Sequence, residues 1–152
     1  MKRLWVAFTL VMLVSFLILG WIGTRIYQEM PPIPGQVVTT DGQVLIDTGE
    51  ISAGQNVWQS LGGMEVGSVW GHGSYVAPDW TADWLHREAV FILDQWASEE
   101  FGSEFDELSA ENQAQLEARL KVLMRTNTYN ESTATITIDP IRVDAFEANL
   151  EH

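Results

Sequence analysis

An apolar run from Leu4 to Ile22 sets the first limit on what this 152-residue chain can be. Thr9, Ser15 and Gly20 interrupt the run, and a helix in lipid tolerates such residues. At a rise of about 1.5 Å per residue, a helix of this length reaches about 28 Å, close to the thickness of the hydrocarbon core of a bilayer. The run therefore predicts a transmembrane helix.

The charges around the run predict its orientation. Lys2 and Arg3 precede it and only Arg25 follows closely, so the positive-inside bias keeps the N-terminus in the cytoplasm. The alternative is a cleaved signal peptide, but Gly20–Arg25 makes a poor cleavage site. We therefore expect a single-pass anchor among the lipids of the inner (cytoplasmic) membrane, with the rest of the chain periplasmic or extracytoplasmic.

Composition excludes several classes of function. The chain has no cysteine, which excludes disulfide scaffolds, cysteine-ligated metal sites, thiol nucleophiles and thioether-attached haem. Its formal net charge is −13, and nucleic acids are excluded as partners because their binding depends on Lys and Arg neutralising phosphates. Without Lys2 and Arg3 the remainder has 6 basic and 21 acidic residues, a net charge of −15.

The sequence divides into three parts. Residues 1–28 form the cytoplasmic N-terminus and the anchor, and residues 29–36 form a connector whose three prolines stiffen it. Residues 37–152 form one acidic domain. Its first element is a hairpin over Val37–Ile46 that turns at Asp41-Gly42, a pair that tolerates positive φ. A short helix over Ser52–Leu61 follows, and five glycines within Gly62–Gly73 predict a loop without regular structure.

Two longer helices are expected next. Thr81 caps the first, which carries one apolar face made of Leu85, Ala89, Ile92 and Trp96. The acidic stretch Glu99–Glu107 is expected to be a solvated linker. Ser109 starts the second helix, which has an apolar stripe of Leu116, Leu120, Leu123 and Met124.

A strand and a final helix complete the domain. Thr133–Ile138 alternates Thr with Ala or Ile, as a half-buried strand does. Asp139-Pro140 is a helix cap followed by proline in the first turn. The fold class expected from these elements is mainly α with small β elements.

Two short motifs carry a resemblance to a known family. Gly54–Trp58 reads G-Q-N-V-W, and Gly71–Asp79 reads G-H-G-S-Y-V-A-P-D. The pattern resembles the haem-c-bearing small subunit of bacterial nitric oxide reductase, where G-x-x-V-W leads to C-x-x-C-H and then to G-E-G-A-Y-x-A-P-E. Aligned without a gap, the haem-attachment motif falls on residues that offer neither thiol nor imidazole: Gly63, Met64, Glu65, Val66 and Gly67.

Longer motifs narrow the resemblance. The segments G-Q-N-V-W-Q-S-x-G-G, V-W-G-H-G-x-Y-V-A-P-D-W and A-D-W-L-H-R-E-A resemble the N-terminal region of the quinol-dependent nitric oxide reductases. There, a transmembrane helix and a haem-free cytochrome-c-like domain precede the catalytic membrane part. The resemblance implies the same two parts here, as a separate small subunit or as the N-terminal segment of a longer protein.

The resemblance also implies a function. Two NO, two electrons and two protons would give N2O and water in a haem-copper-type catalytic partner, which holds haem b, haem b3 and non-haem iron. No catalytic residue and no cofactor held by this chain alone are expected, and without haem c the electrons would enter from quinol. The family's calcium ion, near the haem propionates, would be shared with the partner through Gly73 and Tyr75.

The remaining candidates are contacts with the partner. His72, between glycines, is an interface donor, a pH-sensitive contact or simply exposed. For His86 we expect a buried side chain hydrogen-bonded to Asp83, with a metal site as the alternative. Arg87 is either half of a surface pair with Glu88 or a partner for an acidic or propionate group. The aromatic interface candidates are Trp80 and Trp84.

Two other functions remain open from the sequence. A related NO dismutase would share this segment, because the residues that distinguish it lie around the active site of the catalytic part. A freestanding membrane-anchored binding or assembly module would keep the cytochrome-like fold and have no enzyme activity.

Overall fold

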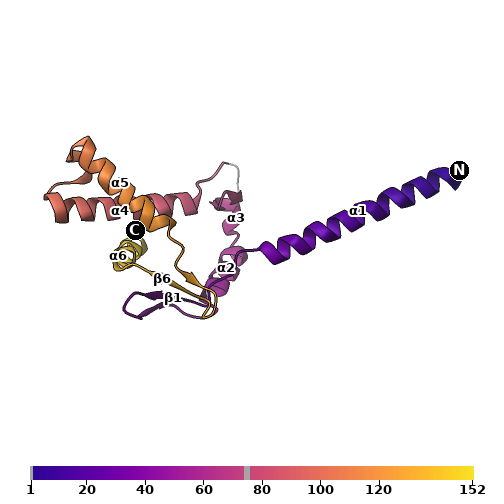
Figure 1. Cartoon of the computed structure of the whole chain (residues 1–152), viewed down its shortest axis with the longest axis horizontal. Coiled ribbons are helices and arrows are strands. Elements are labelled where there is room, and N and C mark those ends of the chain that lie inside the picture. The colour runs from indigo at the N-terminus through magenta and orange to yellow at the C-terminus, as the bar shows by residue number, and fades with distance from the viewer. Residues whose placement is uncertain (1, 74–75) are drawn as a thin grey trace. The chain divides into compact units, whose positions relative to one another are not determined.

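The computed structural model describes residues 2–73 and 76–152, which divide into two compact units at Ile33 and Pro34 (Figure 1). The first unit contains one helix, α1 (Lys2–Glu29), and its apolar side chains are exposed along its length. The helix is long and apolar enough to cross a membrane. It extends past the predicted span to Glu29, which forms an ion pair with Arg25 at 2.5 Å.

The second unit contains five α-helices, one 3-10 helix and six short strands in its described part. The helices are α2 (Glu50–Ser60), α3 (Gly63–Val66), α4 (Trp80–Phe101), η1 (Phe105–Glu107), α5 (Ala110–Arg125) and α6 (Pro140–Leu150). The strands are β1 (Gln36–Thr39), β2 (Val44–Ile46), β3 (Ser68–Val69), β4 (His72–Gly73), β5 (Tyr129–Asn130) and β6 (Thr135–Ile138). The expectation of a mainly helical unit with small sheets is confirmed.

A four-stranded sheet joins the two ends of this unit in the order β2-β1-β6-β5. The predicted hairpin is confirmed, because β1 pairs antiparallel with β2 and Gly42 turns the chain at a φ of 88°. The parallel pairing of β1 with β6, in which Val37 lies opposite Ile136, was not predicted from the sequence. Hydropathy identifies a strand but does not name its neighbour, so this long-range pairing had no local signal.

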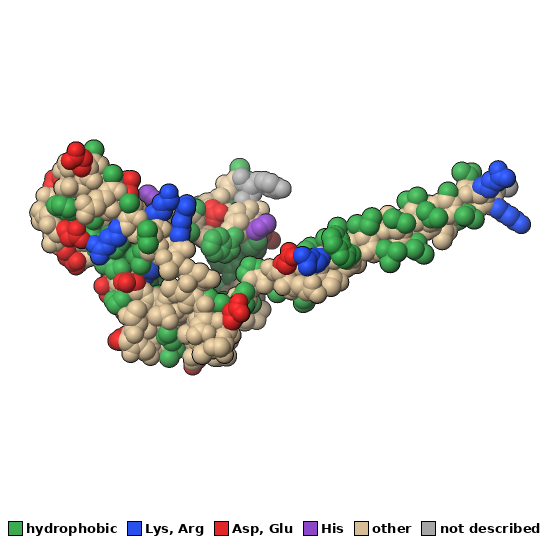
Figure 2. Space-filling model, in the orientation of Figure 1, with side chains coloured by type: hydrophobic (Ala, Val, Ile, Leu, Met, Phe, Trp, Pro, Cys, Tyr) green, Lys and Arg blue, Asp and Glu red, His purple; other side chains and the backbone are tan. Residues whose placement is uncertain are grey.

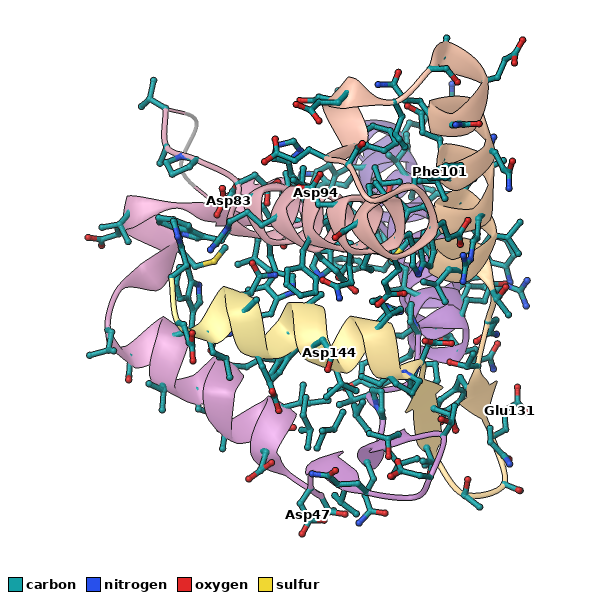
Figure 3. All side chains as sticks on the ribbon, turned by 90° about the vertical axis from the view of Figure 1, so that its left-hand side faces the viewer. Asp47, Asp83, Asp94, Phe101, Glu131 and Asp144 are labelled. Atoms are coloured by element: carbon teal, nitrogen blue, oxygen red, sulfur yellow. The ribbon has the colours of Figure 1, made fainter. Side chains whose placement is uncertain are left out.

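The core lies where α4 packs against α5 and α6 (Figure 3). Ile92 of α4 and Leu116 of α5 are completely buried, and Trp96 and Ala145 join them. The predicted stripe of α5 therefore faces the core, and that of α4 does so at Ile92 and Trp96, whereas Leu85 is exposed. Arg119 covers the outer side of this cluster, with its guanidinium carbon 4.0 Å from the centre of the Trp96 ring and an ion pair to Glu100.

Of the three helix caps that the sequence predicted, one was wrong. Ser109 accepts a hydrogen bond from the backbone N–H of Asn112, and Asp139 caps α6 with proline in its first turn, as expected. The cap of α4 is Asp79 rather than Thr81: its carboxylate accepts hydrogen bonds from two backbone N–H groups of the first turn. Thr81 lies inside the helix, because the Asp in A-P-D-W already satisfies these N–H groups.

Two segments expected to be irregular contain structure. The glycine-rich stretch holds the turn of helix α3 and the β3–β4 hairpin. The acidic stretch is no solvated linker, since α4 continues to Phe101 and η1 follows. Phe105 of η1 packs against the core, and its backbone N–H donates to the carboxylate of Asp94, which is labelled on α4 in Figure 3.

Candidate functional site

The glycine-rich stretch, at the position of the haem-attachment motif of the resembled family, is folded around two tryptophans. Gly62, at a φ of 71°, ends the turn after α2 and starts α3, and Gly67 follows α3 in extended conformation. Gly63 and Gly67 are both buried. The first and last positions of the lost motif therefore lie inside the fold.

Trp58 of α2 fills the space beside Gly63. A Cβ atom on Gly63 would lie 2.3 Å from two carbon atoms of the Trp58 ring, far inside contact distance. The Nε1 atom of this indole is buried and has no hydrogen-bond partner among the described residues. The ring lies directly on the glycine backbone, so position 63 accepts no larger residue without movement of the indole.

Trp80, the first residue of α4, fills the space beside Gly67 at the other end of the motif. A Cβ atom on Gly67 would lie 1.8 Å from Nε1 of Trp80. Because Gly67 stands at the place of the axial histidine in the resembled motif, the indole occupies the space that a side chain there would need. We call Trp58, Gly63, Gly67 and Trp80 the tryptophan clamp.

A haem attached through thioether bonds does not fit these residues. Such a haem needs two thiols and an axial ligand, whereas the chain has no cysteine and the clamp fills the positions of the first thiol and the imidazole. Val66, at the position of the second thiol, carries an exposed apolar side chain. The clamp therefore closes the motif region with packed aromatic rings.

A tight hairpin follows the clamp. β3 and β4 pair antiparallel with Val69 opposite His72, and Trp70 and Gly71 form the turn with φ values of 55° and 73°. The backbone N–H of Trp70 donates to the Thr81 hydroxyl at 3.0 Å, and that of Gly71 donates to the Asp79 carboxylate at 2.7 Å. The start of α4 thus holds the hairpin tip.

One of the two calcium candidates, Gly73, lies at the end of this hairpin. Gly73 has a φ of 145°, and a Cβ atom there would lie 2.6 Å from the backbone oxygen of Gly67, so only glycine fits. Tyr75 lies outside the described residues. His72 is exposed, and no group of three metal-ligating side chains occurs among residues 2–73 and 76–152. Carbonyl oxygens are calcium ligands, so the glycine backbone is compatible with a shared site.

The first turns of α4 correct two expectations. His86 is exposed, and Asp83, labelled in Figure 3, instead forms an ion pair with Arg87 at 2.6 Å. The expected buried Asp–His pair is wrong because in a helix both i+3 and i+4 neighbours lie within reach, and the longer, charged arginine takes the carboxylate. Nε of Arg87 is buried and has no hydrogen-bond partner within the described part of the chain.

Glu88 is not a surface partner of Arg87. Its side chain is 6% exposed and accepts a hydrogen bond from Nε of Arg142 on α6 at 2.6 Å. Nearby, the Trp84 ring packs on Phe146 with ring centres 5.6 Å apart. Glu88 and Trp84 thus attach α6 to α4. Trp84 accordingly serves packing inside the domain, whereas Trp80 is 40% exposed.

The clamp and the Glu88–Arg142 pair were not predicted from the sequence. The clamp had a partial signal, since the residues that replace the attachment motif begin and end with glycine and Trp58 precedes them, but the first tryptophan after them is Trp70 rather than Trp80. The ion pair had none, because 54 positions separate its partners and no motif links them.

Comparison with known proteins identifies the family of the second unit. No curated protein matches the sequence. A family model for the cytochrome c-like domain of NorB, a nitric oxide reductase protein, matches residues 34–152, which is all of the second unit. The chain therefore belongs to the family of the NorB cytochrome c-like domain of nitric oxide reductase.

Proposed function

We propose that this chain is the membrane-anchored, non-catalytic part of a quinol-dependent nitric oxide reductase. The observation that carries the proposal is the tryptophan clamp, because a member of a cytochrome c-like family that fills its attachment motif with indole rings serves as architecture. In this proposal the reduction of two NO to N2O and water takes place in a haem-copper-type partner that holds haem b, haem b3 and non-haem iron.

The number and placement of the histidines support a catalytic centre outside this chain. His72 and His86 are exposed and lie on different elements, and His152 is the last residue of the sequence. Two haems and a non-haem iron need several axial and equatorial ligands, most of them imidazoles. Three dispersed histidines do not supply them.

The route of the electrons follows from the same reasoning. A domain with no covalent haem offers no relay for a soluble cytochrome, so the reductant reaches the catalytic partner through the membrane as quinol. The apolar helix α1 supports a location in the inner membrane. The basic residues before it support a cytoplasmic N-terminus and a periplasmic domain.

At the interface with the partner we place the calcium region and the first turns of α4. The carbonyl oxygen of Gly73, together with Tyr75, would contribute to a calcium ion whose carboxylate and propionate ligands come from the partner. The Arg87 side chain is 28% exposed beside its ion pair with Asp83, so a propionate or carboxylate of the partner would meet the accessible part of the guanidinium. His72, Trp80 and His86 are close to one another in the sequence, and all three are exposed.

Purification of the tagged full chain from its native membrane tests the proposal. We expect a haem-b-rich complex that reduces NO with quinol and contains calcium. A colourless monomer would contradict the proposal and favour the freestanding binding or assembly module. A haem-b complex that yields N2 and O2 from NO would identify the dismutase type.

An Arg87→Ala variant tests the contact at α4. We expect an assembled complex with altered haem b absorbance and slower turnover, because the propionate loses its cationic partner. The control is Arg125→Ala at the exposed end of α5, which should change neither property. A complex of Arg87→Ala that assembles and turns over normally would remove this role.

A further inference from the structure

The tip of the β3–β4 hairpin carries a tryptophan where the backbone disfavours one. Trp70 has a φ of 55°, in the left-handed region that suits Gly, Asn or Asp in a two-residue hairpin turn. Outside glycine, the described residues contain one other positive φ, at Ala134. A bulky residue in this conformation is strained, and such strain is characteristic of sites that bind something.

The fold holds Trp70 in place without burying its side chain. The hydrogen bonds from Trp70 N–H to Thr81 and from Gly71 N–H to Asp79 attach the turn to the rigid start of α4. The Trp70 residue nevertheless stays 73% exposed. Local stability therefore does not explain this residue, since asparagine at the same place would lower the strain and cost no buried contact.

The same segment exposes further large apolar side chains. Leu61 is 80% exposed, Val66 63% and Val76 100%. We use the name Trp70 surface for the exposed apolar side chains of this one segment of the chain, Leu61, Val66, Trp70 and Val76. Aromatic anchors among apolar neighbours are typical of the centres of protein interfaces.

Charge indicates what covers this surface. Residues 51–78 contain one charged side chain, Glu65, whereas the rest of the second unit carries 19 acidic and five basic residues. Figure 2 shows a group of Asp and Glu side chains over α4 and α5, with others elsewhere on the second unit. A second copy of this chain, or anionic lipid headgroups, would bring like charge toward a unit of net charge −15. An uncharged apolar surface of another protein would not.

We propose that the Trp70 surface docks on a water-exposed apolar pocket of the catalytic partner, and that Trp70 is its principal anchor. This inference rests on the proposed function and goes beyond it, because it names the contact that carries the affinity. The left-handed turn presents the indole in a fixed direction before binding, which lowers the entropy lost in association.

The Trp70→Asn variant tests whether Trp70 binds the partner or only stabilises the fold. We expect the melting temperature of the full chain in detergent to stay the same or rise by a few degrees, because asparagine suits the turn. The amount of haem-b partner recovered per chain should fall at least about 10-fold at limiting partner concentration, as for an aromatic hot spot. Ala134→Gly relieves the same kind of backbone strain and should leave recovery unchanged.

The possible outcomes distinguish a failure of the proposed function from a failure of the anchor proposal. If the wild-type chain recovers no haem-b partner, the proposed function fails. If the wild type recovers it and Trp70→Asn recovers as much, the anchor proposal fails while the function stands. A fall in melting temperature of more than about 5 °C, roughly 1 kcal/mol for a domain of this size, would make Trp70 a structural residue and also overturn the proposal.

A photo-crosslinking amino acid at position 70 of the full chain in native membranes identifies the occupant. We expect a crosslink to a haem-b-containing protein. A crosslink to phospholipid, or to a second copy of the chain, would overturn the proposal. The same amino acid at the exposed position of Val122 on α5 is the matched control and should give no such product.

Discussion

Nε1 of Trp80 lies where a side chain on Gly67 would stand, since a Cβ atom there would be 1.8 Å away. Gly67 aligns with the axial histidine of the attachment motif in the haem-c-bearing small subunit that the sequence resembles, and the indole at the start of α4 fills the space that a side chain there would need. Trp58 and Gly63 repeat the relationship at the other end of α3. Packing of the domain therefore depends on glycine at both positions.

Gly67→Ala should destabilise the domain although it adds a single methyl group. The indole or the backbone must move, and overpacking of this kind costs about 1–3 kcal/mol of unfolding free energy. Urea unfolding followed by tryptophan fluorescence measures the change. Gly54→Ala in α2 is the control, because nothing lies within 4 Å of its Cβ position and alanine favours a helix by about 0.5–1 kcal/mol. Equal stability of Gly67→Ala and the wild type would show that the clamp is loose.

Arg142→Met should destabilise the packing of α6 on α4. The substitution leaves the carboxylate of Glu88 buried without its cation, and we expect a loss of about 2–3 kcal/mol, below the value for a fully buried pair because Arg142 is partly exposed. The double variant with Glu88→Gln should recover part of that loss. Arg119→Met is the control for an exposed pair and should cost about 1 kcal/mol or less. Additive effects of the two substitutions would contradict the pairing.

The β1–β2 hairpin should loosen in acid. The Thr39 hydroxyl donates to Asp41 and lowers the pKa of that carboxyl below its ordinary 3.8, and the side chain of Gln36 does the same for the pKa of Asp47. Both groups bind protons more weakly in the folded state. Their contribution to stability is therefore present above pH 3.8 and is lost as the pH falls through the lower folded values.

NMR titration of the Asp41 carboxyl checks this expectation. Thr39→Val keeps the shape of the buried side chain and removes the donor, so the pKa of Asp41 should rise toward 3.8 in this variant. The pKa of Asp47 serves as the internal control, because its donor is Gln36. A pKa of Asp41 that does not respond would mean that Thr39 does not set it.

Local patterns predicted most of the secondary structure. Apolar spacing placed Ile92 and Leu116 in the core, and Asp139-Pro140 marked the start of α6, because these signals act within a few residues. The pairing of β1 with β6 and the bond of Glu88 to Arg142 join distant segments, and no local pattern encodes them. The turn of helix in α3 escaped prediction because tertiary packing under Trp58 outweighs the low helix propensity of glycine.

At the site, the motif alignment predicted which residues stand in place of the haem-attachment motif. The structure adds that two indole rings pack on the first and the last of them. Exposure separated the histidine and tryptophan candidates: His86 is exposed and Trp80 is 40% exposed although it packs on Gly67, whereas Trp84 packs on Phe146. Residue type alone could not make this distinction, since an aromatic side chain suits a core and an interface equally well. The calcium proposal for Gly73 and Tyr75 stays a prediction.

The most direct test of the central claim is a haem assay on the denatured polypeptide. The full chain would be produced together with the machinery that attaches haem to c-type cytochromes, separated by denaturing electrophoresis and assayed as the pyridine haemochrome. A domain that serves as architecture beside another protein's metals predicts no haem at the position of this 17.1 kDa chain. Haem that stays on the chain after denaturation would contradict the account.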